Sequence, residues 1–183
     1  MEQSPAFQAL LTLANQSKAT AKGLPAQEQT KKEWSGIGFG LLGHQFVVPM
    51  GQVSELLEVP SYTRLPGVKP WVRGVSNVRG RLLPVIDLAS FLGHRLNSPH
   101  KQQRILVLEG AELYCGLLVD QSYGIQHFLV DTYQQTSHLE EPNVQPFLLG
   151  SYELEQGTWH VFSMVNLIEH PDFISAARTP MAS

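Results

Sequence analysis

The apolar residues of this chain fall into short runs that are separated by turn-forming residues. The 183 residues include 15 Gly and 12 Pro, roughly one residue in seven, and this density disfavours long helices. About nine runs have strand length and follow one another at roughly 8–20-residue spacing, which is typical of a β-barrel or β-sandwich. These runs are Ile37–Leu41, Phe46–Val48, Trp71–Val75, Leu82–Ile86, Ile105–Leu108, Leu113–Val119, Ile125–Val130, Phe147–Tyr152 and Thr158–Met164. We therefore expect an all-β fold class with only short helices.

The connections between these runs are also predictable. Residues 77–80, Asn-Val-Arg-Gly, tolerate the positive φ angles of a tight hairpin turn. Asp87 precedes the short apolar segment 88–92 and Gly93 follows it, so we expect an N-capped helix of one or two turns. A second short helix is expected at Val165–Glu169. Three hairpin-like segments are loosely alike, at residues 37–48, 71–86 and 105–119. This likeness fits two small barrels as well as one large barrel.

The two ends of the chain differ from the strand-rich part. After Ser4-Pro5, apolar residues follow at helical spacing and predict a short amphipathic helix. Residues 16–32 have the composition of a flexible tether. We expect three parts: the N-terminal helix with its tether at 1–33, a folded domain at 34–170, and a flexible tail at 171–183.

The residues that catalytic and metal sites require are scattered. The single cysteine, Cys115, excludes an internal disulfide and any Cys-based zinc site, and its mid-strand position predicts a buried, inert thiol. The seven His residues never occur at the i, i+2 or i, i+4 spacing of metal ligands. The sequence shows no nucleophile elbow, phosphate-binding loop or catalytic acid pair. We expect a protein that is not an enzyme and that uses no cofactor or metal.

The sequence also bears on the cellular compartment. No run of 18 apolar residues occurs, and the first residues lack the basic segment of a signal peptide. The lone thiol fits a reducing compartment. We therefore expect a cytoplasmic protein.

Charge is distributed unevenly along the chain. Residues 59–104 hold eight Lys or Arg and one acid, whereas residues 105–183 hold one Arg and ten acids. Two interpretations stay open: a basic and an acidic side attract different partners, or the two segments fold together and neutralise each other. The basic stretch, with Trp71 available for stacking, makes a small nucleic-acid-binding barrel the alternative function. The ten acids after residue 104 count against that alternative.

Four motifs follow one another between Val53 and Leu88. They are Val53-Ser54-Glu55-Leu56, Leu65-Pro66-Gly67, Gly74-Val75-Ser76-Asn77-Val78-Arg79-Gly80 and Pro84-Val85-Ile86-Asp87-Leu88. In this order and spacing they resemble the CheW-type coupling proteins of bacterial chemotaxis. The block from Trp34 to Arg81 is most similar to the members that serve type IV pilus twitching motility. Later segments extend the resemblance to about residues 36–169, although Gln121–Gly124 departs from the family pattern.

The resemblance implies a fold of two intertwined five-stranded SH3-like β-barrels that share a hydrophobic core. It implies a non-enzymatic adaptor between the helical tip of a methyl-accepting chemoreceptor and the regulatory domain of a CheA-type histidine kinase. Such an adaptor is recruited to receptor arrays at the inner membrane, with the receptor tip in a groove between the barrels and the kinase at one end. No nucleic acid and no membrane insertion are expected. The implied partner-binding residues are Val53, Glu55, Leu56, Asn77, Arg79 and Gly80.

The chemistry of these residues assigns some of them further roles. The planar guanidinium of Arg79 can hold a carboxylate with two parallel hydrogen bonds. An internal bridge to Glu55 and direct contact with a partner are equally open, and both can hold together. We interpret Asp87 as a helix cap, and Gly74 and Gly116 as sites of close strand packing.

Overall fold

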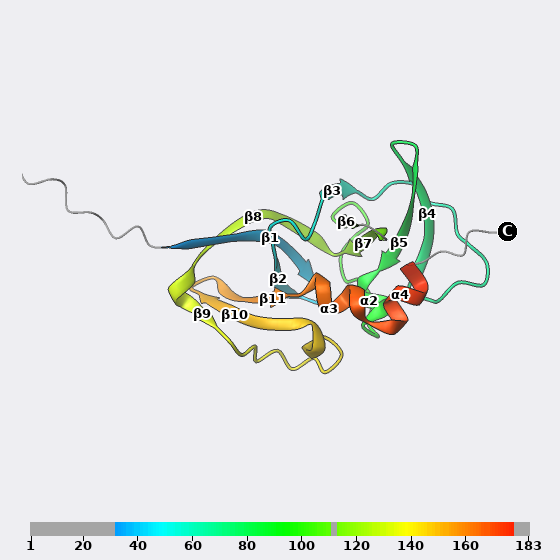
Figure 1. The fold of residues 1–183 in the computed structure, drawn as a ribbon. Helices are drawn as coiled ribbons and strands as arrows, with labels where there is room; N and C mark the ends of the chain where they lie inside the picture. The colour runs from blue at the N-terminus through cyan, green and yellow to red at the C-terminus, as the bar shows by residue number, and fades with distance from the viewer. Residues whose placement is uncertain (1–31, 111–112, 178–183) are drawn as a thin grey trace, which may run out of the picture. The chain divides into compact units, whose positions relative to one another are not determined.

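The computed structural model describes residues 32–110 and 113–177, and the predicted N-terminal helix and its tether up to residue 31 lie outside them. Figure 1 shows two groups of strands and a few short helices. The strands are β1 (Glu33–Leu41), β2 (His44–Pro49), β3 (Glu55–Glu58), β4 (Val72–Val78), β5 (Arg81–Asp87), β6 (Arg104–Glu109), β7 (Tyr114–Val119), β8 (Gln121–Leu129), β9 (Tyr133–Gln134), β10 (Leu148–Leu154) and β11 (Gly157–Phe162). The helices are α2 (Leu88–Phe91), α3 (Met164–Glu169) and α4 (Pro171–Ala177), with 3-10 turns at Val130–Thr132 and Gln145–Phe147. Within these residues, no helix is both long and apolar enough to cross a bilayer.

All nine strands expected from the sequence are present, with slightly shifted ends. The structure adds β3 and β9, whose four and two residues are too few to show a pattern. The helix predicted after Asp87 is α2, and the Ser90 N–H donates to the Asp87 carboxylate at 2.9 Å, which confirms the cap. The helix predicted at 165–169 is α3.

The strands form two sheets, which we call lobe 1 and lobe 2. Lobe 1 has the order β8-β1-β2-β11-β10-β9, and lobe 2 has the order β3-β6-β7-β5-β4. Lobe 2 lies between β2 and β8 in the sequence, so the chain leaves lobe 1 after β2 and returns to it at β8.

Each lobe closes on itself. In lobe 2 the segment after β3 reaches the outer edge of β4, where Thr63 and Val75 exchange backbone hydrogen bonds of 2.8 and 2.9 Å. In lobe 1 the outermost strands β8 and β9 are consecutive in the chain, separated only by Val130–Thr132. The β8–β9 segment is therefore one bent strand that joins both edges of that sheet. With β8 and β9 counted as one strand, each lobe has five strands. The predicted mainly-β fold of two five-stranded lobes is confirmed.

The two lobes are held together by one apolar layer. Side chains alternate along a strand, and in β1 the three residues Ile37, Phe39 and Leu41 all face this layer. Among the described residues, the shared layer contains 21 buried side chains, whereas the interiors of lobe 1 and lobe 2 contain five each. In β2 and β7 one face packs inside a lobe and the other face packs in the shared layer. Strands buried on both faces produce continuous apolar runs, and the predicted shared core is confirmed.

A buried carboxylate ties the lobes together where the chain returns to lobe 1. Asp120 is 6% exposed. It accepts hydrogen bonds from the Leu42 N–H at 3.1 Å in lobe 1, and from Asn97 N and Ser98 N at 2.7 and 2.8 Å in the loop that follows α2. The Ser98 hydroxyl adds a fourth bond at 2.9 Å. Four donors offset the cost of burying the carboxylate.

The prediction of a flexible tail from residue 171 onward is wrong for residues 171–177. These residues form helix α4, which begins with Pro171 at a position that suits proline. Phe173 is fully buried, and its ring packs edge-to-face against Phe91 of α2 with centroids 5.5 Å apart. One buried aromatic side chain, Phe173, therefore holds the helix in place. A single apolar position shows no helical period, so the sequence did not predict this helix.

Gly74 and Gly116 lie where strands approach closely, as predicted. A Cβ at Gly116 would lie 2.6 Å from the Ile105 methyl group. A Cβ at Gly74 would lie 2.1 Å from the Thr63 carbonyl oxygen, and Gly74 also has a φ of +147°. The lack of space beside Thr63 and the positive φ both require glycine next to the Thr63–Val75 pairing, which closes lobe 2.

We expect Gly74→Ala to lower the free energy of unfolding by at least about 2 kcal/mol. The new methyl group clashes with the Thr63 backbone, where the Thr63–Val75 pairing closes lobe 2. Gly110→Ala is the control, since a Cβ there meets nothing within 4 Å, and its effect should stay within about 0.5 kcal/mol. Urea denaturation of both variants measures the difference. Equal stability of the two variants would contradict the close packing of Gly74 against Thr63 at the closure of lobe 2.

Candidate partner-binding surfaces

The six predicted partner-binding residues fall into two groups, and the two that lie in β3, Glu55 and Leu56, point to opposite faces of that strand. Directly paired residues on neighbouring strands point to the same face. Leu56 pairs with Leu106, which belongs to the shared layer, whereas Glu55 pairs with Val107, which lies inside lobe 2. Leu56 therefore lies on the side of the other lobe, and Glu55 lies on the side of the β4–β5 hairpin.

The first group lies where the chain crosses from lobe 1 to lobe 2, and we call residues 50–56 the crossover. Val53 is partly buried against the shared layer, while Met50 and Leu56 are 50% and 36% exposed. The crossover is fixed at its lobe 2 end by the Ser54 N–H, which donates to Val107 O at 2.8 Å.

Helix α3 begins against the same crossover. The Met164 N–H donates to the Gln52 side-chain oxygen at 3.1 Å. The next residue of α3, Val165, is 49% exposed. The junction of the lobes therefore presents apolar side chains from two segments that lie far apart in the sequence.

The second group lies at the turn of the β4–β5 hairpin. Asn77 accepts a hydrogen bond from the Gly80 N–H at 2.9 Å, and Arg79 adopts a φ of +53°. Arg79 forms an ion pair with Glu55, so the predicted internal bridge is present. The Arg79 side chain remains 76% exposed, against 29% for Glu55. Most of its donor fork is therefore still open to a partner.

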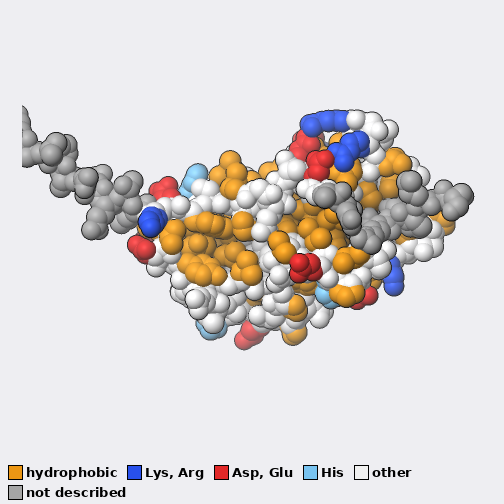
Figure 2. All heavy atoms as spheres, in the orientation of Figure 1, with side chains coloured by type: hydrophobic (Ala, Val, Ile, Leu, Met, Phe, Trp, Pro, Cys, Tyr) orange, Lys and Arg blue, Asp and Glu red, His pale blue; other side chains and the backbone are white. Residues whose placement is uncertain are grey.

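A second ion pair lies beside the first. Arg81 donates to Glu109 at 2.6 Å, and its guanidinium lies 3.8 Å from the centre of the Tyr114 ring. Figure 2 shows basic and acidic side chains gathered at this corner, over β3 and the hairpin. Leu82, the next residue, is 68% exposed. We call this charged corner the hairpin tip.

A third arginine of the hairpin has a structural partner that the sequence patterns do not predict. Arg73 donates to Asp87 through its Nε at 2.9 Å, and the Asp87 side chain is fully buried. Asp87 therefore has two roles, since its other oxygen caps α2. A carboxylate just before a helix signals the cap, but nothing local in the sequence identifies Arg73 as its partner.

These ion pairs bear on the nucleic-acid alternative. Arg73, Arg79 and Arg81 each neutralise an acidic side chain of the same protein. Arg104 donates to two backbone carbonyls. Three of the eight basic side chains at 59–104 are thus paired with acids in the described part of the chain, which weakens the case for a nucleic-acid surface.

Among residues 32–110 and 113–177, no three His, Cys, Asp or Glu side chains are arranged to hold a metal ion. Cys115 is buried, and this burial raises the pKa of its thiol to about 12. The thiol is therefore protonated at neutral pH, as expected of an inert core residue.

This chain is similar to known proteins in both sequence and fold. The family model described as CheW-like domain matches residues 35–175. Protein PilI of Pseudomonas aeruginosa is 48% identical over 93% of this chain and 96% of its own length. The chemotaxis protein CheW of Bacillus subtilis is 33% identical over 47% of this chain and 55% of its own length. The crystal structure of the scaffolding protein TtCheW from Thermoanaerobacter tengcongensis superposes with a TM-score of 0.64 at 20% identity, covering 77% of this chain and 96% of that one. The last similarity shows the fold.

Two arginines of the same hairpin should contribute very differently to stability. Arg79→Ala removes an exposed ion pair and should lower the free energy of unfolding by less than about 1 kcal/mol. Arg73→Ala leaves the buried Asp87 carboxylate without its cation and should cost about 2–3 kcal/mol. Chemical denaturation of both variants measures this difference. A large loss for Arg79→Ala would make the hairpin tip chiefly structural.

Proposed function

The chain belongs to the family of CheW-like domain proteins, and we propose that it couples the cytoplasmic tip of a methyl-accepting chemoreceptor to the regulatory domain of a CheA-type histidine kinase. Such coupling is not enzymatic, because the adaptor acts by holding two other proteins together. The receptor and the kinase recruit this adaptor from the cytoplasm to receptor arrays at the inner membrane. We propose that it controls twitching by type IV pili, since the similarity to Protein PilI extends over nearly the whole chain.

The observation that carries the proposal is the apolar surface at the junction of the lobes. Met50, Leu56 and Val165 are each at least about one third exposed, on a junction that the shared layer makes rigid. A receptor tip is a helical hairpin, and amphipathic helices bind by laying an apolar ridge against such a surface. We assign the receptor to the crossover and the start of α3.

The hairpin tip has the chemistry of a second contact. Charged groups at the rim of an interface set orientation and association rate more than affinity. Arg79 keeps most of its side chain exposed while Glu55 holds it in place. We assign the hairpin tip to the kinase regulatory domain, with Asn77 and Gly80 shaping the turn that presents Arg79.

We expect Leu56→Lys to increase the dissociation rate of a receptor cytoplasmic fragment about tenfold, because a buried apolar contact contributes about 1.4 kcal/mol or more. Leu56 suits the test better than Val53, whose side chain also packs against the shared layer. The matched control is Leu154→Lys, at a leucine 41% exposed in the other lobe. Binding kinetics on an immobilised receptor fragment measure both rates. An unchanged dissociation rate for Leu56→Lys would remove the crossover from the interface.

We expect Arg79→Ala to slow association with the kinase regulatory domain and to reduce the salt dependence of that rate, since Arg79 acts through charge. Arg95→Ala removes the same charge from another exposed position of lobe 2 and should leave association nearly unchanged. Association rates measured at several salt concentrations distinguish the two variants. Equal effects of both variants would mean that only net charge matters, and would withdraw the role assigned to Arg79.

A further inference from the structure

A polar side chain joins the two segments of the proposed receptor surface. The crossover carries the exposed side chains of Met50 and Leu56, and α3 carries that of Val165. The Met164 N–H donates to the Gln52 side-chain oxygen at 3.1 Å, across 112 positions of the chain. Among the residues that the structure describes, this is the only hydrogen bond between the crossover and α3.

A tight turn at the start of the crossover places Gln52. The Gln52 N–H donates to Pro49 O at 3.2 Å, and Gly51 adopts a φ of +90°, a left-handed conformation that favours glycine. The same turn leaves the Met50 side chain 50% exposed. The backbone of this turn therefore fixes both the exposed Met50 and the origin of the Gln52 side chain.

The other hydrogen bonds at the start of α3 lead away from the crossover. The Ser163 hydroxyl accepts from the Asn166 N–H at 3.1 Å, which caps the helix. The Ser163 N–H donates to Phe147 O at 2.7 Å, and Asn166 Nδ2 donates to Pro146 O at 3.1 Å. These last two bonds fasten α3 to the 3-10 turn before β10. They leave the polar connection to the crossover to the Met164 N–H.

We propose that Gln52 is a positioning residue for receptor binding, an inference that rests on the receptor role proposed above. Its hydrogen bond holds the first turn of α3 at a fixed place beside the crossover, so that Val165 keeps its spacing from Met50 and Leu56. The Met164 side chain packs in the shared layer, but apolar burial has no preferred direction, whereas a hydrogen bond does. A surface whose parts are already in place binds without the cost of ordering them.

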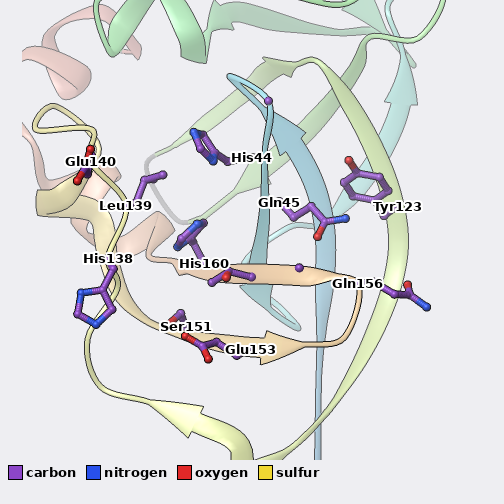
Figure 3. Close-up of a pocket in the computed structure, with 13 residues that line it drawn as sticks. His44, Gln45, Tyr123, His138, Leu139, Glu140, Ser151, Glu153, Gln156 and His160 are labelled. Carbon is purple, nitrogen blue, oxygen red and sulfur yellow. The ribbon is translucent and has the colours of Figure 1, made fainter.

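The first test compares two substitutions of Gln52. Gln52→Met keeps the length of the side chain and removes the acceptor, so an immobilised receptor cytoplasmic fragment should release it about threefold faster or more. Gln52→Glu keeps an oxygen at the same reach and should dissociate within about twofold of the parent rate. Gln156→Met is the matched control. Gln156 is exposed at the β10–β11 turn of lobe 1 (Figure 3), and its dissociation rate should equal that of the parent chain.

A double-mutant cycle with Val165→Ala distinguishes positioning from direct contact. If Gln52 acts by placing Val165, Gln52→Met accelerates dissociation much less in the Val165→Ala background than in the parent chain, because the truncated side chain has little contact left to lose. A Gln52 side chain that contacts the receptor itself would instead give the same factor in both backgrounds.

Amide hydrogen exchange at Met164, followed by NMR in the free protein, tests the hydrogen bond without the receptor. Gln52→Met should speed this exchange, whereas Gln52→Glu and Gln156→Met should leave it as slow as in the parent chain. The same spectra show that the variants are folded.

Four results would each overturn the positioning role. They are unchanged exchange at Met164 in Gln52→Met, a parent-like dissociation rate for that variant, no rescue by Gln52→Glu, and additive effects in the cycle. A parent chain that binds no receptor fragment, with the exchange results as expected, would overturn the proposed receptor role and the positioning role with it. The exchange measurement therefore distinguishes the failure of one proposal from the failure of the other.

Discussion

The apolar layer between the lobes is the interaction on which the other features depend. Each lobe interior buries only five side chains among the described residues, which is little for a sheet that must stay folded alone. The shared layer buries 21 and receives strands from both sheets. Because this layer joins the lobes, the crossover at residues 50–56 and the start of α3 are held against each other. The proposed receptor surface therefore exists only while the layer is intact.

Much of the fold could be predicted because strands buried on both faces give continuous apolar runs with turn residues between them. The nine longer strands and the Asp87 cap follow from such local signals. Strand β3 does not, since Glu55–Glu58 is short and amphipathic, and its pairing with β6 is set by residues far along the chain. Helix α4 has a single buried anchor, Phe173. One apolar position gives no helical period, so the sequence of this segment predicts a flexible tail.

The candidate site shows the same limit of local reasoning. The family motif identifies Val53 through Leu56 as one unit, yet the pleat of β3 turns Glu55 and Leu56 to opposite faces. The bridge from Arg79 to Glu55 was foreseeable from charge and turn chemistry. The partners of Arg73 and Asp120 were not, because their hydrogen bonds join segments that only the folded chain brings together. The uneven charge is neutralised in part: Arg81 meets Glu109 of the acidic segment, whereas Arg73 and Arg79 meet acids outside it.

The position of lobe 2 between β2 and β8 has a mechanical consequence. The backbone crosses the lobe junction twice, once on each side of this inserted lobe, and the return crossing is fastened by the four hydrogen bonds of Asp120. A force that pulls the two lobes apart is thus shared by two parallel covalent connections. Separating the lobes would also expose the 21 buried side chains of the shared layer to water. Two covalent crossings and one shared apolar layer therefore connect the lobes, and together they limit how far one lobe can turn against the other.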